Sequence, residues 1–199
     1  MKIADKLLSI DDFRRLGALK IYSPTALVAF TQSHEVDPDA QGDPVPGARS
    51  FRIEELFSAR TKFLRQLWLA RQPGVLPMEM MQRFALLVAQ EVVKRLAFEG
   101  TLSDIRLTAA LAAQAQYLAG TNNARSVEPL RAAVRQAVLD HSLHASDRAA
   151  AGCSSVYDAL DPNGYEAGAG AAFHYLELFP GGGADDWLRA HLLTLIRAA

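Results

Sequence analysis

The spacing of apolar residues after position 50 constrains the fold more than any other feature of this chain. Ile53, Leu56 and Phe63 are separated by three and seven positions, which places them on one face of an α-helix. A half-buried strand would instead alternate apolar and polar residues, and no alternation of useful length occurs in the 199 residues. The sequence therefore predicts an all-α protein.

Capping residues and helix breakers mark the ends of the expected helices. Ser103, Ser126 and Ser146 are favourable N-caps, and glycine or proline follows several of the helical stretches. About seven main helices are expected, over residues 51–72, 77–98, 103–120, 126–143, 146–160, 163–179 and 185–199. Because the connections are short, neighbouring helices are expected to be antiparallel, as in a helical bundle. A solenoid of two-helix units remains an alternative.

The first 50 residues are expected to form an arm and a loop ahead of the bundle. Ser9 and Ser23 can each cap a short helix. The stretch before position 51 then contains three prolines, two glycines and four acidic residues, with almost nothing apolar, which is typical of a loop. We therefore expect an N-terminal helical arm over 1–32, a flexible loop over 33–50 and a helical bundle domain over 51–199.

Composition and charge exclude several classes of protein. The formal net charge is −1, and no basic strip with interleaved aromatic residues occurs, so no nucleic-acid partner is expected. No apolar run reaches the roughly 18 residues that span a membrane, and no signal-peptide pattern precedes the first helix. The single cysteine, Cys153, cannot form an internal disulfide. We therefore expect a cytoplasmic protein without a membrane partner.

The distribution of charge along the chain is uneven. Residues 49–106 contain ten Lys or Arg and six Asp or Glu, a net of +4, whereas residues 140–186 contain eight acidic residues and one arginine, a net of −7. One interpretation is ordinary solvated helix faces. The other is an acidic surface for a basic protein partner, because complementary charge raises association rates and selects partners. That surface would combine Asp140, Asp147, Asp158, Asp161, Glu166, Asp185 and Asp186.

Small residues recur at helical spacing in the last third of the chain. One face of the helix expected over 146–160 carries Ala149, Gly152 and Val156, continuing from Ala145. The next helix has a similar face, made of Gly164, Ala167, Gly168 and Ala171. Glycine within a helix costs about 1 kcal/mol relative to alanine, so its presence indicates a close contact that offsets this cost. We expect the two helices to form a close-packed hairpin.

The histidines and the cysteine are the candidate chemical groups of the same region. His141 and His144 are three positions apart and would share a helix face, where they could bind a metal. No pattern supplies a third ligand, so neither a metal nor another cofactor is expected. A metal-dependent helical enzyme that uses His141, His144 and His174 remains an alternative. Cys153 is expected in the middle of a helix as a buried structural residue rather than a nucleophile.

Asp104 and Arg106 are expected to form a structural ion pair. Both lie where a helix begins. An aspartate suits the positive end of the helix dipole, whereas an arginine is disfavoured there. Arg106 is therefore expected to contact a carboxylate across the bundle as well.

The segment from about residue 85 to 178 resembles the all-helical immunity proteins of bacterial polymorphic toxin systems. The matching stretches are "SDIRLTAALAAQAQYLAG", then "LRAAVRQAV", then alanine-rich helices that end in "AGAGAAFHYLE". In that family an aspartate-x-arginine opens a helix, and an aromatic residue and a glycine close it. Asp104, Arg106, Tyr117 and Gly120 occupy these positions.

This resemblance implies a cytoplasmic protein that binds and blocks one cognate toxin and has no catalytic activity. The acidic C-terminal half would then face a basic toxin, such as a nuclease. A small-ligand-binding helical bundle is a further alternative. The oligomeric state is not predicted from the sequence.

Overall fold

The computed structural model of this chain describes residues 2–15, 50–58, 62–72, 74–144 and 146–199, and most of them are helical. The helices are η1 (Ile3–Asp5), α1 (Ile10–Arg15), α3 (Ile53–Ser58), α4 (Phe63–Ala70), α5 (Met78–Phe98), α6 (Ile105–Leu118), α7 (Ala124–His144), α8 (Asp147–Ala159), α9 (Gly164–Leu178) and α10 (Gly182–Ala198). The strands β1 (Leu7–Ser9) and β2 (Ser50–Arg52) form an antiparallel pair. The predicted all-α class is therefore confirmed.

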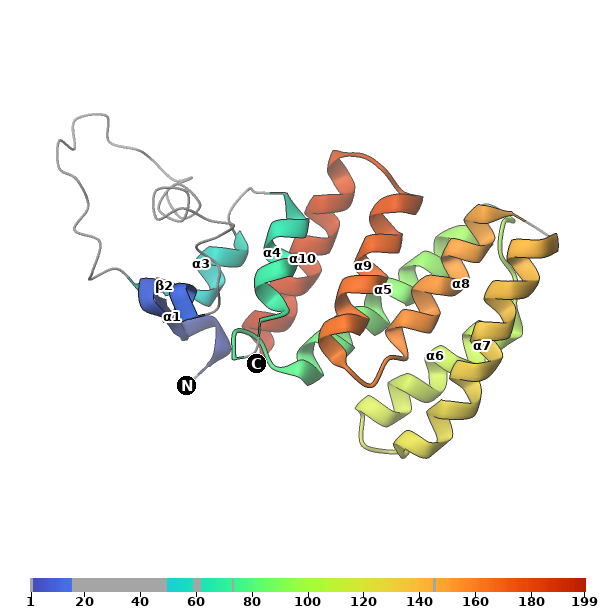
Figure 1. Ribbon diagram of the computed structural model, residues 1–199, viewed down its shortest axis with the longest axis horizontal. Coiled ribbons are helices and arrows are strands. Elements are labelled where there is room, and N and C mark those ends of the chain that lie inside the picture. Colours follow the sequence, from blue (N-terminus) through green and yellow to red (C-terminus); the bar gives the residue numbers. More distant parts are fainter. Residues whose placement is uncertain (1, 16–49, 59–61, 73, 145) are drawn as a thin grey trace.

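The long helices stand side by side in an elongated array (Figure 1). Helices α10, α9, α8 and α7 follow one another along the array, α4 stands next to α10, and α5 and α6 lie behind them. Successive helices from α5 to α10 run in opposite directions, so the connections between them lie alternately at the upper and the lower ends of the helices in Figure 1. This is the arrangement expected for an antiparallel bundle. None of the helices that the structure describes is both long and apolar enough to cross a membrane.

Helix α5 is the centre of the core. It packs against α6, α8, α9 and α10. Its sequence is apolar around most of its circumference, so it can bury side chains against all four neighbours at once. The residues that are completely buried along it include Met81, Phe84, Val88, Val92 and Leu96.

The predicted helix over 51–72 is wrong, because three elements occupy this stretch. Its first residues belong to β2, with Phe51 opposite Leu8 of β1, and the helical part is divided between α3 and α4. The pairing partner lies about 40 residues earlier in the sequence, so no local pattern announces the strand. At the start of α3, the Glu55 carboxylate accepts a hydrogen bond from the backbone N–H of Arg52 at 3.1 Å.

Several of the predicted helix ends are confirmed. Ser9 begins α1, since its Oγ accepts from the backbone N–H of Asp12 at 3.1 Å while Asp12 accepts from the backbone N–H of Ser9 at 2.8 Å. Ser146 caps α8 through its side chain. Gly100 and Gly120 follow α5 and α6 with φ values of +70° and +74°, a left-handed conformation that favours glycine.

Three predicted helix starts are wrong by one to three residues. Asp104, not Ser103, caps α6, and its carboxylate accepts from the backbone N–H two residues ahead at 2.9 Å. Helix α7 begins at Ala124, where the side chain of Asn123 rather than Ser126 accepts a backbone hydrogen bond. Helix α10 begins at Gly182 instead of residue 185. Neighbouring cap-forming residues compete at the starts of α6 and α7, and the sequence does not rank them. Helix α10 follows Gly181 without a side-chain cap.

The N-terminal residues 2–15 pack into the same core as the helices. Leu8 and Phe13 are buried, and the ring of Phe13 meets that of Phe51 edge to face at 5.9 Å. The strand β1 within this segment was not predicted. The rest of the predicted arm, with the helix expected after Ser23, and the predicted loop up to residue 49 lie outside the described residues, so the division at 33–50 stays a prediction.

The small-residue faces of α8 and α9 were predicted to pack against each other, and for three of their glycines this is wrong. The two helices do pack against each other, but Gly152, Gly164 and Gly168 face α5. A Cβ at Gly164 would overlap the backbone carbonyl oxygen of Met78, and a Cβ at Gly152 would overlap the side chain of Leu96. The glycines therefore let both helices approach the central helix closely.

Candidate functional site

The seven acidic residues predicted to form one binding surface are divided between the two opposite ends of the helices. Four of them follow or precede the α7–α8 and α9–α10 connections: Asp140, Asp147, Asp185 and Asp186. The other three surround the α8–α9 turn at the opposite end: Asp158, Asp161 and Glu166. Within α8, Asp147 and Asp158 are separated by about 16 Å along the axis, at about 1.5 Å per residue. The structure thus divides the predicted surface into two.

Four of these carboxylates are paired with arginines. The pairs are Asp140 with Arg106 (2.7 Å), Asp161 with Arg131 (2.6 Å), Glu166 with Arg71 (2.5 Å) and Asp186 with Arg189 (2.6 Å). All four arginines lie outside residues 140–186. The net charge of that segment therefore overstates the negative charge that is available to a partner.

A groove of about 400 Å³ runs along the seam between α4 and α9, next to the α8–α9 turn. Its apolar lining comes from Leu64, Leu67, Trp68, Ala169, Gly170 and Phe173, and its charged lining from Arg71, Asp158, Glu166 and His174. Two of the predicted acidic residues and one of the candidate histidines are thereby brought into one site.

Two large apolar side chains at this groove face solvent. Leu64 of α4 is 49% exposed and Phe173 of α9 is 56% exposed. The backbone of α9 comes close to α8 beside them, since a Cβ at Gly170 would overlap the carboxylate of Asp158. Gly170 thus lets α9 approach α8 closely, while Leu64 and Phe173 present apolar surface at the edges of the groove.

His174 of α9 contacts two carboxylates at the groove, that of Asp158 on α8 and that of Glu177 on its own helix. Its Nε2 lies 3.4 Å from Oδ2 of Asp158, and its Nδ1 lies 3.3 Å from Oε2 of Glu177. The hydrogen bond to Asp158 raises the pKa of His174, against the effect of burial, and Glu177 adds to the increase. These contacts favour the protonated imidazole, which offsets part of the negative charge at the groove.

The other candidate histidines lie elsewhere. His141 contacts Asp104 at 3.4 Å at the far end of α7, and His144 is exposed as the last residue of that helix. Neither lines the groove that contains His174. Within the described ranges, no group of three or more His, Cys, Asp or Glu side chains is placed to hold a metal ion. The structure does not bring the three histidines together.

The predicted ion pair between Asp104 and Arg106 is confirmed. Nη2 of Arg106 lies 2.7 Å from Oδ2 of Asp104, and Nη1 lies 2.7 Å from Oδ2 of Asp140 on α7. The Arg106 guanidinium lowers the pKa of Asp104 from 3.8 to about 2, and Asp104 raises the pKa of Arg106 in turn. Asp140 is thus the carboxylate that was expected across the bundle.

Cys153 is completely buried in α8, as expected for a structural residue. Burial raises the pKa of its thiol to about 12. The thiolate that a nucleophile needs is therefore strongly disfavoured at neutral pH.

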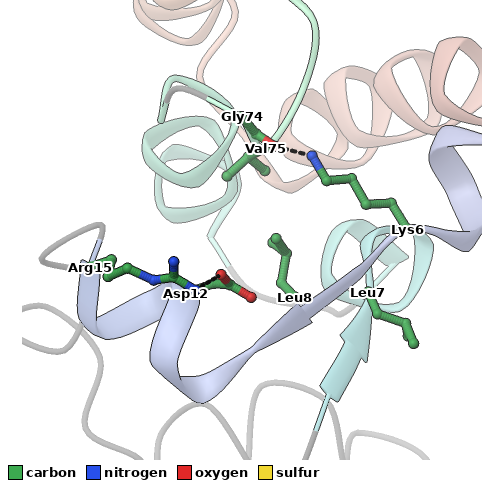
Figure 2. A pocket seen from close by; sticks show the side chains of 7 residues that line it. All are labelled: Lys6, Leu7, Leu8, Asp12, Arg15, Gly74 and Val75. Atoms are coloured by element: carbon green, nitrogen blue, oxygen red, sulfur yellow. Dashed lines mark hydrogen bonds and ion pairs between the residues drawn. The ribbon is translucent and has the colours of Figure 1, made fainter.

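A second surface pocket, of about 300 Å³, lies near the N-terminal strand. In Figure 2, the Lys6 ammonium reaches the carbonyl oxygen of Gly74, and Arg15 pairs with Asp12 at 2.7 Å. Lys6 is engaged by a backbone carbonyl, and Arg15 and Asp12 by each other, so the pocket offers a ligand less than the α4–α9 groove does.

Comparisons with protein-family models, curated proteins and solved structures found no match. The function is therefore argued from the geometry of the groove. Sequence reasoning identified Asp158, Glu166 and His174 as candidates but missed Leu64 and Phe173. No local signal distinguishes these two from core residues, because their exposure depends on how α4 meets α9.

Proposed function

We propose that this chain is a non-enzymatic binding protein that holds a segment of a protein partner in the α4–α9 groove. The observation that supports this is the combination of exposed Leu64 and Phe173 with the carboxylates of Asp158 and Glu166 around one groove. Apolar side chains surrounded by polar groups are typical of protein–protein contact sites.

The charges of the groove favour a basic partner. Asp158 and Glu166 line the groove, and Glu177 lies beside it in contact with His174, while Arg71 and His174 offset part of the negative charge of these three carboxylates. A partner segment that carries both an apolar side chain and a Lys or Arg would match this arrangement. Its positive charge would speed association, and its apolar side chain would slow dissociation.

The resemblance to immunity proteins makes this proposal more specific. A protein that neutralises a toxin acts by occupying part of the toxin's surface, and it needs no catalytic group of its own. We therefore propose a basic toxin as the class of partner. The groove uses Asp158 and Glu166 of the predicted acidic surface, and the four carboxylates at the other end of the array are not part of the proposed contact.

Site-specific photo-crosslinking tests the proposal. The crosslinking residue p-benzoylphenylalanine replaces Phe173 in one variant and Phe98 in a matched control. Phe98 is the last residue of α5, is 95% exposed and does not line the groove. Each protein is irradiated in lysate of the native host, and the products are identified by mass spectrometry. We expect one basic protein to be crosslinked at position 173, and excess unmodified chain to compete with it. Crosslinking only at position 98, or equally at both positions, contradicts the proposal.

Binding to the purified partner provides the second test. A contact residue at the centre of an interface typically costs more than 1 kcal/mol when truncated, so Phe173→Ala should weaken the Kd by about tenfold. Phe98→Ala should leave the Kd unchanged. Equal Kd values for the two variants would contradict the role of the groove.

A further inference from the structure

A smaller pocket lies on the other side of the α8–α9 turn, where α5, α6 and α7 meet the turn. Its volume is about 80 Å³. Its polar groups come from Gln82 of α5, Gln114 and Tyr117 of α6, Glu128 of α7 and Asp161 of the turn. This pocket is separate from the α4–α9 groove, and nothing in the proposed function requires it.

Two buried glutamines line the pocket. Gln114 is 2% exposed, and its amide makes no hydrogen bond with any residue that the structure describes. The buried Gln82 donates its Nε2 hydrogen to the carbonyl oxygen of Pro162 at 3.0 Å, and its Oε1 accepts no hydrogen bond from the described part of the chain. The polar atoms of these amides are not among the enclosed side-chain atoms that lack a partner in the described part of the chain, so they open onto the pocket, where a ligand can bind to them.

The groups open to a ligand include three that accept hydrogen bonds. They are the two glutamine oxygens and the exposed carboxylate of Glu128, whereas Gln114 and Tyr117 supply the donors. Asp161 is already occupied, since it accepts from Arg131 at 2.6 Å and from the backbone N–H of the α8–α9 turn at 2.8 Å. The charge of Arg131 is thereby offset, and Glu128 makes the pocket negative. A cation with several N–H groups matches this set best.

We propose that this pocket binds a guanidinium group, either of an arginine side chain or of a free guanidinium compound. The volume corresponds to two or three water molecules, at about 30 Å³ each, which is enough for a group of a few heavy atoms. A guanidinium is flat, so its faces can contact the ring of Tyr117 and the side chain of Val127 while its edge donates to the acceptors. An ammonium has fewer donors and is more strongly hydrated.

The chain itself contains a guanidinium held in the same manner beside the pocket. The guanidinium of Arg131 lies 4.7 Å from the ring centroid of Tyr157 and pairs with Asp161. An aromatic face and a carboxylate together thus hold one such group in this part of the fold. The pocket offers Tyr117 and Glu128 for a second.

Nuclear magnetic resonance titration of the full chain tests this inference. The side-chain amide signals of Gln82 and Gln114 are followed while methylguanidinium is added, with acetamide and methylammonium as comparison probes. We expect saturable shifts of both signals, with a Kd for methylguanidinium at least about tenfold lower than for either comparison probe. Gln114→Met keeps the side-chain length and should abolish the saturable shift at Gln82. The control Gln90→Met, at an exposed position of α5, should leave it unchanged.

Three results would show that the pocket does not bind a guanidinium group. No saturable shift with methylguanidinium, an unchanged titration in Gln114→Met, or water contacts alone at the Gln114 amide overturns the inference. If Gln114→Met does not fold, the exposed variant Glu128→Gln replaces it, and it should weaken methylguanidinium binding while leaving acetamide binding unchanged. Tighter binding of N-acetylarginine amide than of L-arginine identifies a polypeptide side chain as the source, and the reverse order identifies a free compound.

Discussion

Replacing Asp104 by asparagine tests how much the charge pair at the start of α6 stabilises the fold. Asparagine is as good an N-cap as aspartate, so the hydrogen bond from the α6 backbone can be kept. The substitution removes the negative charge that pairs with Arg106. The variant therefore separates the ion pair from the helix cap, which Asp104→Ala would remove together.

The pKa of Asp104 provides the magnitude. Lowering this pKa from 3.8 to about 2 corresponds to roughly 2 kcal/mol of folding free energy, because each pKa unit is worth a little over 1 kcal/mol. The Asp104 side chain is 10% exposed and the Arg106 side chain is 32% exposed, so solvent screens the pair in part. Because the folded pKa is depressed, this stabilisation is present above pH 3.8 and is lost as the pH falls through 2. The same relation leaves roughly half of the stabilisation at pH 3.

Urea unfolding followed by circular dichroism measures this contribution. We expect Asp104→Asn to lower the free energy of unfolding by about 2 kcal/mol at pH 7 and by roughly half as much at pH 3. Asp147→Asn is the control, since Asp147 is exposed in the first turn of α8, where a charge contributes about 0.3–1 kcal/mol. An Asp104→Asn variant as stable as the control variant at pH 7, or a loss that does not shrink at pH 3, would refute the reasoning.

Three further predictions concern packing, reactivity and association. Gly164→Ala forces α9 away from the α5 backbone and should cost about 1–3 kcal/mol in urea unfolding, whereas Gly183→Ala, with open space around it, should cost nothing or stabilise slightly; equal stabilities would contradict the close approach. Cys153 should react with a thiol reagent only at the rate of unfolding, and rapid labelling of the native protein would contradict its burial. Glu166→Lys should slow association with a basic partner by about tenfold at low salt, as measured by stopped-flow fluorescence, and Asp147→Lys at the opposite end should not.

The helices themselves were largely determined by the local sequence. The bounds of α5, the cap of α8 at Ser146 and the glycine after α6 were all predicted, because a cap or a breaker acts within about four residues along the chain. Errors of a few residues occurred where two cap-forming residues adjoin, as at Ser103 and Asp104. The strand pair was missed altogether, since its stability comes from a partner segment far away in the sequence.

The residue types of the candidate site were also visible in the sequence, but its composition was decided by packing. Asp158, Glu166 and His174 were candidates from the start, whereas their association with Leu64 and Phe173 depends on how α4 lies against α9. Packing also decided how much negative charge is available to a partner. The excess of carboxylates in residues 140–186 is a property of the sequence, but their arginine partners come from other helices. Electrostatic attraction depends on distance in space, and only the tertiary structure determines which of these charges are neutralised and which remain for a partner.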